Sequence, residues 1–115
     1  MSSRNYILFL EDIVNSMEKV KTYINNLTYA EFSEKDIVID AVVRNLEVIG
    51  EAAKNVPMKI REENKQIPWR RMIGLGNIIS HEYFGIDLNI VWTIITKNLP
   101  DTRKDIEELI GKLRK

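Results

Sequence analysis

The residues best suited to chemistry lie between positions 67 and 87, in the stretch IPWRRMIGLGNIISHEYFGID. This stretch contains His81, the only histidine of the chain, and Tyr83 follows it two residues later. An imidazole with an ordinary pKa near 6.5 can accept or donate a proton close to neutral pH. A single histidine on a polar helix face is also a common surface feature. From the pattern alone, an acid/base site and a solvated face therefore both remain open.

A helix through this stretch would have one polar and one apolar face. At 100° per residue, four polar or small residues fall within about 60° of one another, and four apolar ones fall within about 80° elsewhere. The polar face holds Arg70, Gly74, Asn77 and His81, and the apolar face holds Met72, Leu75, Ile79 and Tyr83. We expect the apolar face to be core or a subunit interface, and Gly74 to permit close packing.

Other kinds of chemical site have less support. The chain has no cysteine, which excludes disulfides, thiolate metal ligands and cysteine nucleophiles within it, and fits a reducing cytoplasm. One histidine leaves too few soft ligands for zinc, and we expect neither a metal nor another cofactor. Glu47 and Glu51 stand one helical turn apart, but without a third acidic partner a surface role is expected. For Arg44, within an apolar stretch, we expect a buried ion pair or an interface contact.

The composition is that of one compact domain covering residues 1–115, with 44% hydrophobic and 30% charged residues. Seventeen basic residues balance seventeen acidic ones, so no global field attracts nucleic acid or membrane. Residues 1–57 carry six basic and nine acidic residues, net −3, whereas residues 58–115 carry eleven and eight, net +3. This asymmetry is either ordinary scatter or the mark of an anion-binding face or an acidic partner.

No segment resembles a membrane or export signal. The N-terminal apolar run spans only residues 6–10 before acidic residues follow, which is too short for a signal peptide. No stretch approaches the roughly 20 apolar residues that span a bilayer. We therefore expect a cytoplasmic location without membrane contact.

The apolar periodicity predicts an all-α fold, a bundle of five or six helices. The expected helices cover about residues 4–27, 36–55, 58–65, 68–83, 88–98 and 100–113, with prolines 57, 68 and 100 between them. The first two long helices should pack as an antiparallel pair. Residues 28–36 read as a polar turn in which Ser33 would cap the next helix, and Asp87 would cap the helix from residue 88. The segment from residue 91 to 99 should face the core.

Three segments resemble one known family. The string GNIISHEYFGID at residues 76–87, the following VWTIITKNLPDTRKDIEELI and the middle segment VVRNLEVIGEAAKNV are similar to the HepT-like branch of the HEPN domains. Together they extend over most of the chain. The resemblance implies a HEPN-type helical bundle that forms a two-fold dimer, and a metal-independent RNA endonuclease acting as a toxin. It also implies a partner antitoxin, a small nucleotidyltransferase of the MNT type.

The resemblance also implies roles for individual residues. The family's active motif is Arg-x4-His-x-Tyr, in which His81 matches the histidine and Tyr83 the tyrosine to which the antitoxin attaches AMP. Asn77 matches the polar residue that follows the motif arginine. The arginine itself is missing, because Gly76 stands five residues before His81.

Gly76 is unfavourable for chemistry and for the helix alike. RNA cleavage without a metal needs a base for the 2′-hydroxyl, a role open to His81, and a cation for the charge at phosphorus. Glycine supplies no cation, and in a helix interior it costs up to about 1 kcal/mol relative to alanine. We therefore expect a toxin inactivated by natural decay or by selection in a host that did not tolerate it.

Two nearby arginines could replace the missing one. Arg70 and Arg71 lie roughly 15–16 Å from His81 along a straight helix, beyond the reach of one arginine side chain. Rescue across a two-fold interface stays open, as does a plain surface role beside Trp69. The competing functions are an impaired ribonuclease toxin, a non-catalytic dimer that binds a nucleotidyltransferase partner, and a helical scaffold unrelated to RNA.

Overall fold

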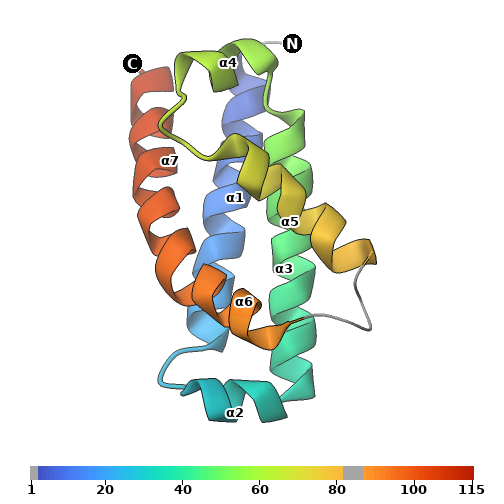
Figure 1. Cartoon of the computed structure of the whole chain (residues 1–115). Coiled ribbons are helices and arrows are strands. Elements are labelled where there is room, and N and C mark those ends of the chain that lie inside the picture. Colours follow the sequence, from blue (N-terminus) through green and yellow to red (C-terminus); the bar gives the residue numbers. More distant parts are fainter. Residues whose placement is uncertain (1–2, 82–86) are drawn as a thin grey trace.

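The structure is a computed structural model that describes the backbone of residues 3–81 and 87–115 and the side chains of residues 6–75 and 87–115. All regular structure in these residues is helical, and the helices form one elongated bundle (Figure 1). The prediction of an all-α fold is therefore confirmed. Within the same ranges, no helix is both long and apolar enough to cross a membrane.

Two antiparallel helices, α1 (Ser3–Tyr23) and α3 (Asp36–Asn55), form the centre of the bundle, as the sequence predicts (Figure 1). The C-terminal helix α7 (Leu99–Leu113) packs along α1. The helix α5 (Trp69–His81) crosses α3. Helix α5, which carries the candidate site, is therefore held by the most central helix of the fold.

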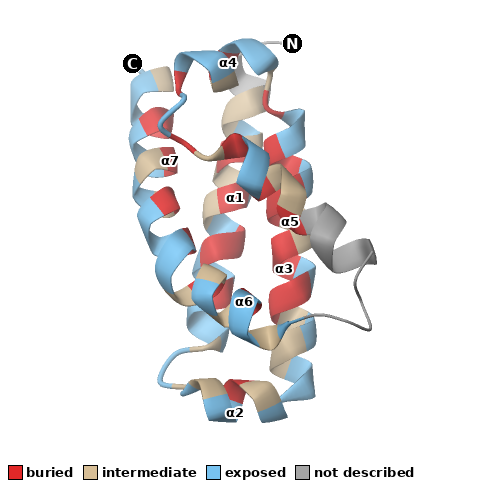
Figure 2. Ribbon diagram, viewed as in Figure 1, coloured by how far each residue is buried: buried red, intermediate tan, exposed pale blue. Residues whose placement is uncertain are grey.

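The core follows from helical spacing in the two central helices. On α1, Leu10, Ile13, Met17 and Val20 recur three or four residues apart and are buried. On α3, eight residues between Val42 and Ala53 are buried, which explains why its apolar positions cover more than one stripe. Figure 2 shows this burial concentrated where α1 and α3 face each other. Each fully buried aliphatic side chain stabilises the fold by about 1.5–3 kcal/mol.

The connection between α1 and α3 differs from the prediction. Helix α1 ends at Tyr23 rather than near residue 27, and Asn26 adopts a left-handed backbone with φ of 65°. Asparagine tolerates this conformation better than most residues, so it suits a helix end. The expected polar turn contains a short helix, α2 (Tyr29–Glu34), whose Phe32 is buried against Trp92 at a ring-centroid distance of 5.1 Å. Tertiary burial of one aromatic ring stabilises this helix.

Ser33 is not the N-cap of α3, so that prediction was wrong. Ser33 lies inside α2, where its hydroxyl donates to the carbonyl of Ala30 at 2.8 Å. The capping residue of α2 is Thr28, and the N-cap position of α3 is Lys35, which makes no side-chain capping bond. A hydroxyl within a helix bonds a carbonyl one turn back instead of free N–H groups.

The entry into α5 is fixed by hydrogen bonds from two buried side chains. After the short helix α4 (Met58–Glu63), the Asn64 side-chain amide donates to the carbonyl of Ile60 at 2.8 Å. The indole N–H of Trp69 donates to the carbonyl of Asn64 at 3.0 Å. These bonds satisfy polar groups that burial would otherwise leave without partners, and they set the start of α5 just after Pro68.

The last two predicted helices are one continuous helix. Helix α6 (Leu88–Thr93) leads through a π-helical turn, η2 (Ile94–Asn98), into α7 without a break. In that turn the Leu99 N–H donates to the carbonyl of Ile94, five residues back. The wider turn accommodates Pro100, whose ring would collide with a carbonyl of a regular helix. Asp87 caps α6 as predicted, accepting from the Asn89 N–H at 2.9 Å.

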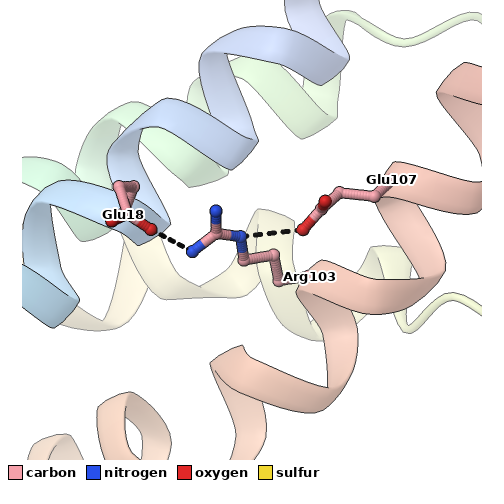
Figure 3. A network of polar contacts seen from close by, with 3 residues as sticks. All are labelled: Glu18, Arg103 and Glu107. Carbon is pink, nitrogen blue, oxygen red and sulfur yellow. Dashed lines mark hydrogen bonds and ion pairs between the residues drawn. The ribbon is translucent and has the colours of Figure 1, made fainter.

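Ion pairs link α7 to α1. Arg103 contacts Glu18 of α1 and, at 2.8 Å, Glu107 of its own helix (Figure 3). Arg114, at the end of α7, contacts Glu11 of α1. The hydrogen bond to Glu18, supported by Glu107, raises the pKa of Arg103. Because these carboxylates are solvent-accessible, each pair adds at most about 1 kcal/mol. The pairs therefore set the register of α7 on α1 more than they stabilise the fold.

Candidate functional site

Three of the predicted site residues lie on one helix. Gly76, Asn77 and His81 all belong to α5, and the backbone is helical throughout this stretch. Gly76 and His81 are five residues apart, which is about 7.5 Å along the helix axis. The side chains of residues 76–81 lie outside the described part of the chain, as does Tyr83 altogether. The structure therefore places the motif positions on α5 without testing their roles.

The preceding turns of α5 show which face is buried. Met72 and Leu75 are buried in the core of the single chain, whereas Arg70 and Arg71 are exposed. For Met72 and Leu75, the core alternative is correct within the single chain. The other predicted members of that face, Ile79 and Tyr83, lie outside the described side chains.

Gly74 does not serve close packing within the single chain, so that part of the expectation was wrong. A Cβ atom built at Gly74 would meet nothing within 4 Å outside the helix backbone of its own turn. The space beside it is open, and an alanine would fit there. Because glycine has no side chain, free volume remains beside this position of α5.

That free volume belongs to a cleft between α5 and the π-helical turn, which we call the α5–α7 cleft. Its volume is about 400 Å³, and its apolar lining includes Met72, Leu75, Ile94 and Leu99. Arg70 and Arg71 also line it. Sequence reasoning missed this cleft, because it joins residues about 25 positions apart through a helix that continues across Pro100.

The same helix geometry limits what these arginines can do for His81. Since α5 is helical from Trp69 to His81, Arg71 stands about 15 Å from His81 along the axis. Neither arginine can replace the motif arginine within one chain.

A second groove contains more acidic than basic residues. It lies across α1, α3 and α5, has a volume of about 570 Å³, and is lined by Arg44 and Lys54 together with three carboxylates. The carboxylates belong to Asp12, Glu47 and Glu51. Arg44 is exposed, and none of the ion pairs among the described residues includes it, so the expected buried pair is wrong. Within the described residues, no three His, Asp or Glu side chains gather as metal ligands do.

Comparison with known proteins identifies the family. The family described as ribonuclease HepT-like matches residues 13–109, which is most of the chain. The chain belongs to the HepT-like ribonuclease family. The all-α bundle agrees with this membership.

Relatives of this HepT-like chain are named as ribonucleases. It is 38% identical to the candidate RNase MJ1380 of Methanocaldococcus jannaschii over 93% of this chain and 98% of that protein. It is 38% identical to a second candidate RNase of that organism, MJ0127, over 96% and 91% of the two chains. A Thermococcus cleftensis protein named as a ribonuclease HepT is 31% identical over 92% and 96%. No solved structure matches this chain significantly.

The candidate residues of this HepT-like chain lie within the segment that the family matches. The family match covers Gly76, Asn77, His81 and Tyr83, together with both arginines of the α5–α7 cleft. All of these positions except Tyr83 lie on the described part of α5.

Proposed function

We propose that this HepT-like chain is the toxin component of a toxin–antitoxin pair, a metal-independent RNA endonuclease impaired by glycine at position 76. The observation that carries the proposal is the placement of residues 76, 77 and 81 on one helix inside the family match. RNA is the substrate class because the family is a ribonuclease family.

The proposed reaction is an internal transfer at phosphorus. His81 takes the proton of a 2′-hydroxyl, and the resulting oxygen attacks the neighbouring phosphorus. The bond to the 5′-oxygen of the next nucleotide breaks, and that oxygen takes up a proton. The products are a 2′,3′-cyclic phosphate and a free 5′-hydroxyl. Asn77 donates a hydrogen bond to the phosphate in this scheme.

Gly76 removes the group that would stabilise the transition state. Negative charge accumulates on the phosphorus oxygens, and a fixed cation beside them is worth roughly 3 kcal/mol or more of the barrier. An arginine at position 76 would lie about 7.5 Å from His81 along α5, close enough for both side chains to meet one phosphate. Glycine provides only backbone there, so cleavage is slow or absent.

Two partners complete the proposal. The chain forms a two-fold homodimer, and a nucleotidyltransferase of the MNT type acts as its antitoxin by attaching AMP to Tyr83. The added phosphodiester carries a negative charge and an adenosine, which block an RNA phosphate by repulsion and bulk. A neighbouring reading frame with a Gly-Ser and Asp-x-Asp pattern would support this partner.

Gly76 itself favours a second candidate function. A chain without the catalytic cation can persist as a non-catalytic binding module that keeps the fold, the dimer and the contact with a nucleotidyltransferase. The two functions differ in one respect: only an impaired enzyme regains activity when the arginine is restored.

The test is therefore Gly76→Arg, with Gly76→Ala as its matched control. We expect Gly76→Arg to stop growth on induction and to cleave single-stranded RNA in the presence of a metal chelator. Gly76→Ala restores helix propensity without the cation and should leave growth and RNA intact. Gly76→Arg combined with His81→Ala should be inactive again. A folded Gly76→Arg protein that neither slows growth nor cleaves RNA would contradict the toxin proposal and favour the binding module.

A further inference from the structure

The α5–α7 cleft combines basic side chains with a lining that has no carboxylate among the described residues. Its lining includes Arg70 and Arg71 and no carboxylate. The groove across α1 and α3 contains three carboxylates, whereas two further grooves contain three basic residues and one glutamate each, so their net charge of +2 equals that of the cleft. What sets the cleft apart is that its two arginines face an apolar lining with no carboxylate from the described part of the chain. Such a surface attracts an anion.

The cleft also has the dimensions and the lining of a site for a flat organic group. Its volume of about 400 Å³ lies in the range of small-molecule sites. Met72 and Leu75 form one wall, and Ile94 and Leu99 of the π-helical region line the other side. Asn98 and Thr102 add hydrogen-bonding groups. The open space beside Gly74 keeps the outer part of the cleft unfilled.

We propose that the α5–α7 cleft binds one nucleotide of a single-stranded RNA, with the base between the apolar walls and the adjoining phosphates on Arg70 and Arg71. Arginine binds phosphate with two parallel hydrogen bonds, and apolar walls accept the face of any base. This inference rests on the proposed function, because it takes RNA as the substrate. It adds a binding site on the outer face of α5, separate from the motif positions.

The position of the cleft suits a strand that continues toward His81. Leu75 in the cleft is six residues before His81, about 9 Å along α5. A single strand of RNA spans that distance in a few nucleotides. The cleft nucleotide would thus anchor the strand a short way from the bond to be cut.

A nucleotide fits this cleft better than a second copy of the chain. A two-fold axis through the cleft would bring its two arginines against the same two arginines of the other copy. Four cations would then meet without a carboxylate from the cleft lining to separate them. RNA carries one negative charge per nucleotide and removes this repulsion.

The charge of the cleft is tested by Arg70→Gln with Arg71→Gln in the wild-type Gly76 background. The probe is a fluorescein-labelled single-stranded RNA of roughly 12 nucleotides, whose binding is followed by anisotropy. We expect the double variant to bind about tenfold more weakly or worse. The slope of log affinity against log salt should fall by about 1.4 for two lost phosphate contacts.

The control removes the same charge elsewhere. Arg44→Gln with Lys54→Gln lowers the net charge by the same amount in the groove across α1 and α3. This variant should keep most of the RNA affinity and the salt slope. Equal losses in both double variants would show a general charge effect and overturn the cleft proposal.

The volume of the cleft is tested separately by Gly74→Leu. The new side chain enters open space and favours the helix, so the protein should fold, while the cleft is partly filled. We expect RNA affinity to fall about tenfold, whereas Gly74→Ala keeps it. If Gly74→Leu leaves RNA binding unchanged, or if it instead disrupts a dimer in light scattering, the cleft is not the nucleotide site.

The experiments distinguish failure of the cleft proposal from failure of the proposed function. If Gly76→Arg cleaves RNA and the cleft variants in that background leave KM unchanged, the function stands and the cleft proposal fails. If Gly76→Arg is inactive while the cleft variants lose RNA affinity, the cleft stands and the cleavage proposal fails. If the wild-type chain shows no RNA affinity at low salt, the cleft proposal is overturned whatever Gly76→Arg does.

Discussion

At the scale of single residues, helix propensity and the proposed chemistry both disfavour glycine at position 76. Glycine there weakens α5 by up to about 1 kcal/mol relative to alanine, and it offers no functional group. Glycine at position 74 also disfavours the helix, but it leaves open space beside α5 that belongs to the cleft. In the proposed function, an arginine at position 76 would favour the helix and supply the cation.

Tyr83 provides a prediction on the partner. We expect a cognate nucleotidyltransferase supplied with ATP to increase the intact mass of the chain by one adenylyl group. Tyr83→Phe should abolish most of this labelling, because the phenol oxygen is the attachment point. Tyr23→Phe is the matched control, since Tyr23 is exposed at the end of α1 and shares the same chemistry. Undiminished labelling of Tyr83→Phe would move the target to another residue.

At the scale of elements, α2 depends on reciprocal hydrogen bonds at its first turn. The Thr28 hydroxyl accepts from the Glu31 N–H at 3.2 Å, and the Glu31 carboxylate accepts from the Thr28 N–H at 2.9 Å. Together they satisfy two of the free N–H groups at a helix start. A helix of six residues would otherwise be marginal in water.

Removal of this cap should destabilise the protein measurably. We expect Thr28→Ala to lower the free energy of unfolding by about 1 kcal/mol, because it leaves the Glu31 N–H without its partner. Chemical denaturation followed by circular dichroism measures the change. Ser33→Ala is the control on the same helix, since its hydroxyl only bonds a carbonyl within the helix. A Ser33→Ala loss as large as that of Thr28→Ala would contradict the capping role.

The same cap predicts a pH dependence. The backbone N–H and the hydroxyl of Thr28 hold the pKa of Glu31 below its ordinary value, with a smaller effect from Lys35. A lowered folded-state pKa stabilises the protein fully above the unfolded-state pKa, and this contribution is lost as pH falls through the folded-state pKa. Glu31→Gln should therefore be less stable than wild type at neutral pH, and the difference should shrink in acid. A difference that stays constant from pH 7 to pH 3 would contradict this.

At the scale of the whole molecule, α5 packs against α3 of the central pair, and α7 packs against α1. Several large apolar side chains remain exposed on this single chain, among them Ile37 on α3 at 85% and Ile90 on α6 at 57%. Isolated exposed apolar residues are common, and in the proposed two-fold dimer such residues are candidates for the interface.

The dimer is therefore a prediction at this scale. We expect light scattering at micromolar concentration to give twice the chain mass of 13.4 kDa. Because Met72 and Leu75 are already buried within one chain, their truncation should lower stability rather than dissociate the dimer. Ile37→Ser tests the exposed surface and should leave the fold intact, since little of this side chain is buried. A monomeric wild-type chain would contradict the prediction.

The sequence by itself determined the helices whose signals are local. The bounds of α3, residues 36–55, and the Asp87 cap follow from apolar spacing, a proline and a carboxylate near the helix start. The sequence also placed positions 76, 77 and 81 within one predicted helix, while their roles come from the family resemblance and stay predictions. These features need only interactions between residues a few positions apart.

The tertiary structure decided what depends on contacts between distant segments. Residues 29–34 form a helix through the local capping box of Thr28 and Glu31 and through burial of Phe32 beside Trp92, and only the burial depends on a distant segment. The helix continues past Pro100 through a π-helical turn, which no local rule predicts. The α5–α7 cleft exists only because that continuous helix packs opposite the face of α5 that holds Arg70, Arg71 and Gly74. Burial and packing act between residues far apart in sequence, and the periodicity of one segment does not show which other segment packs against it.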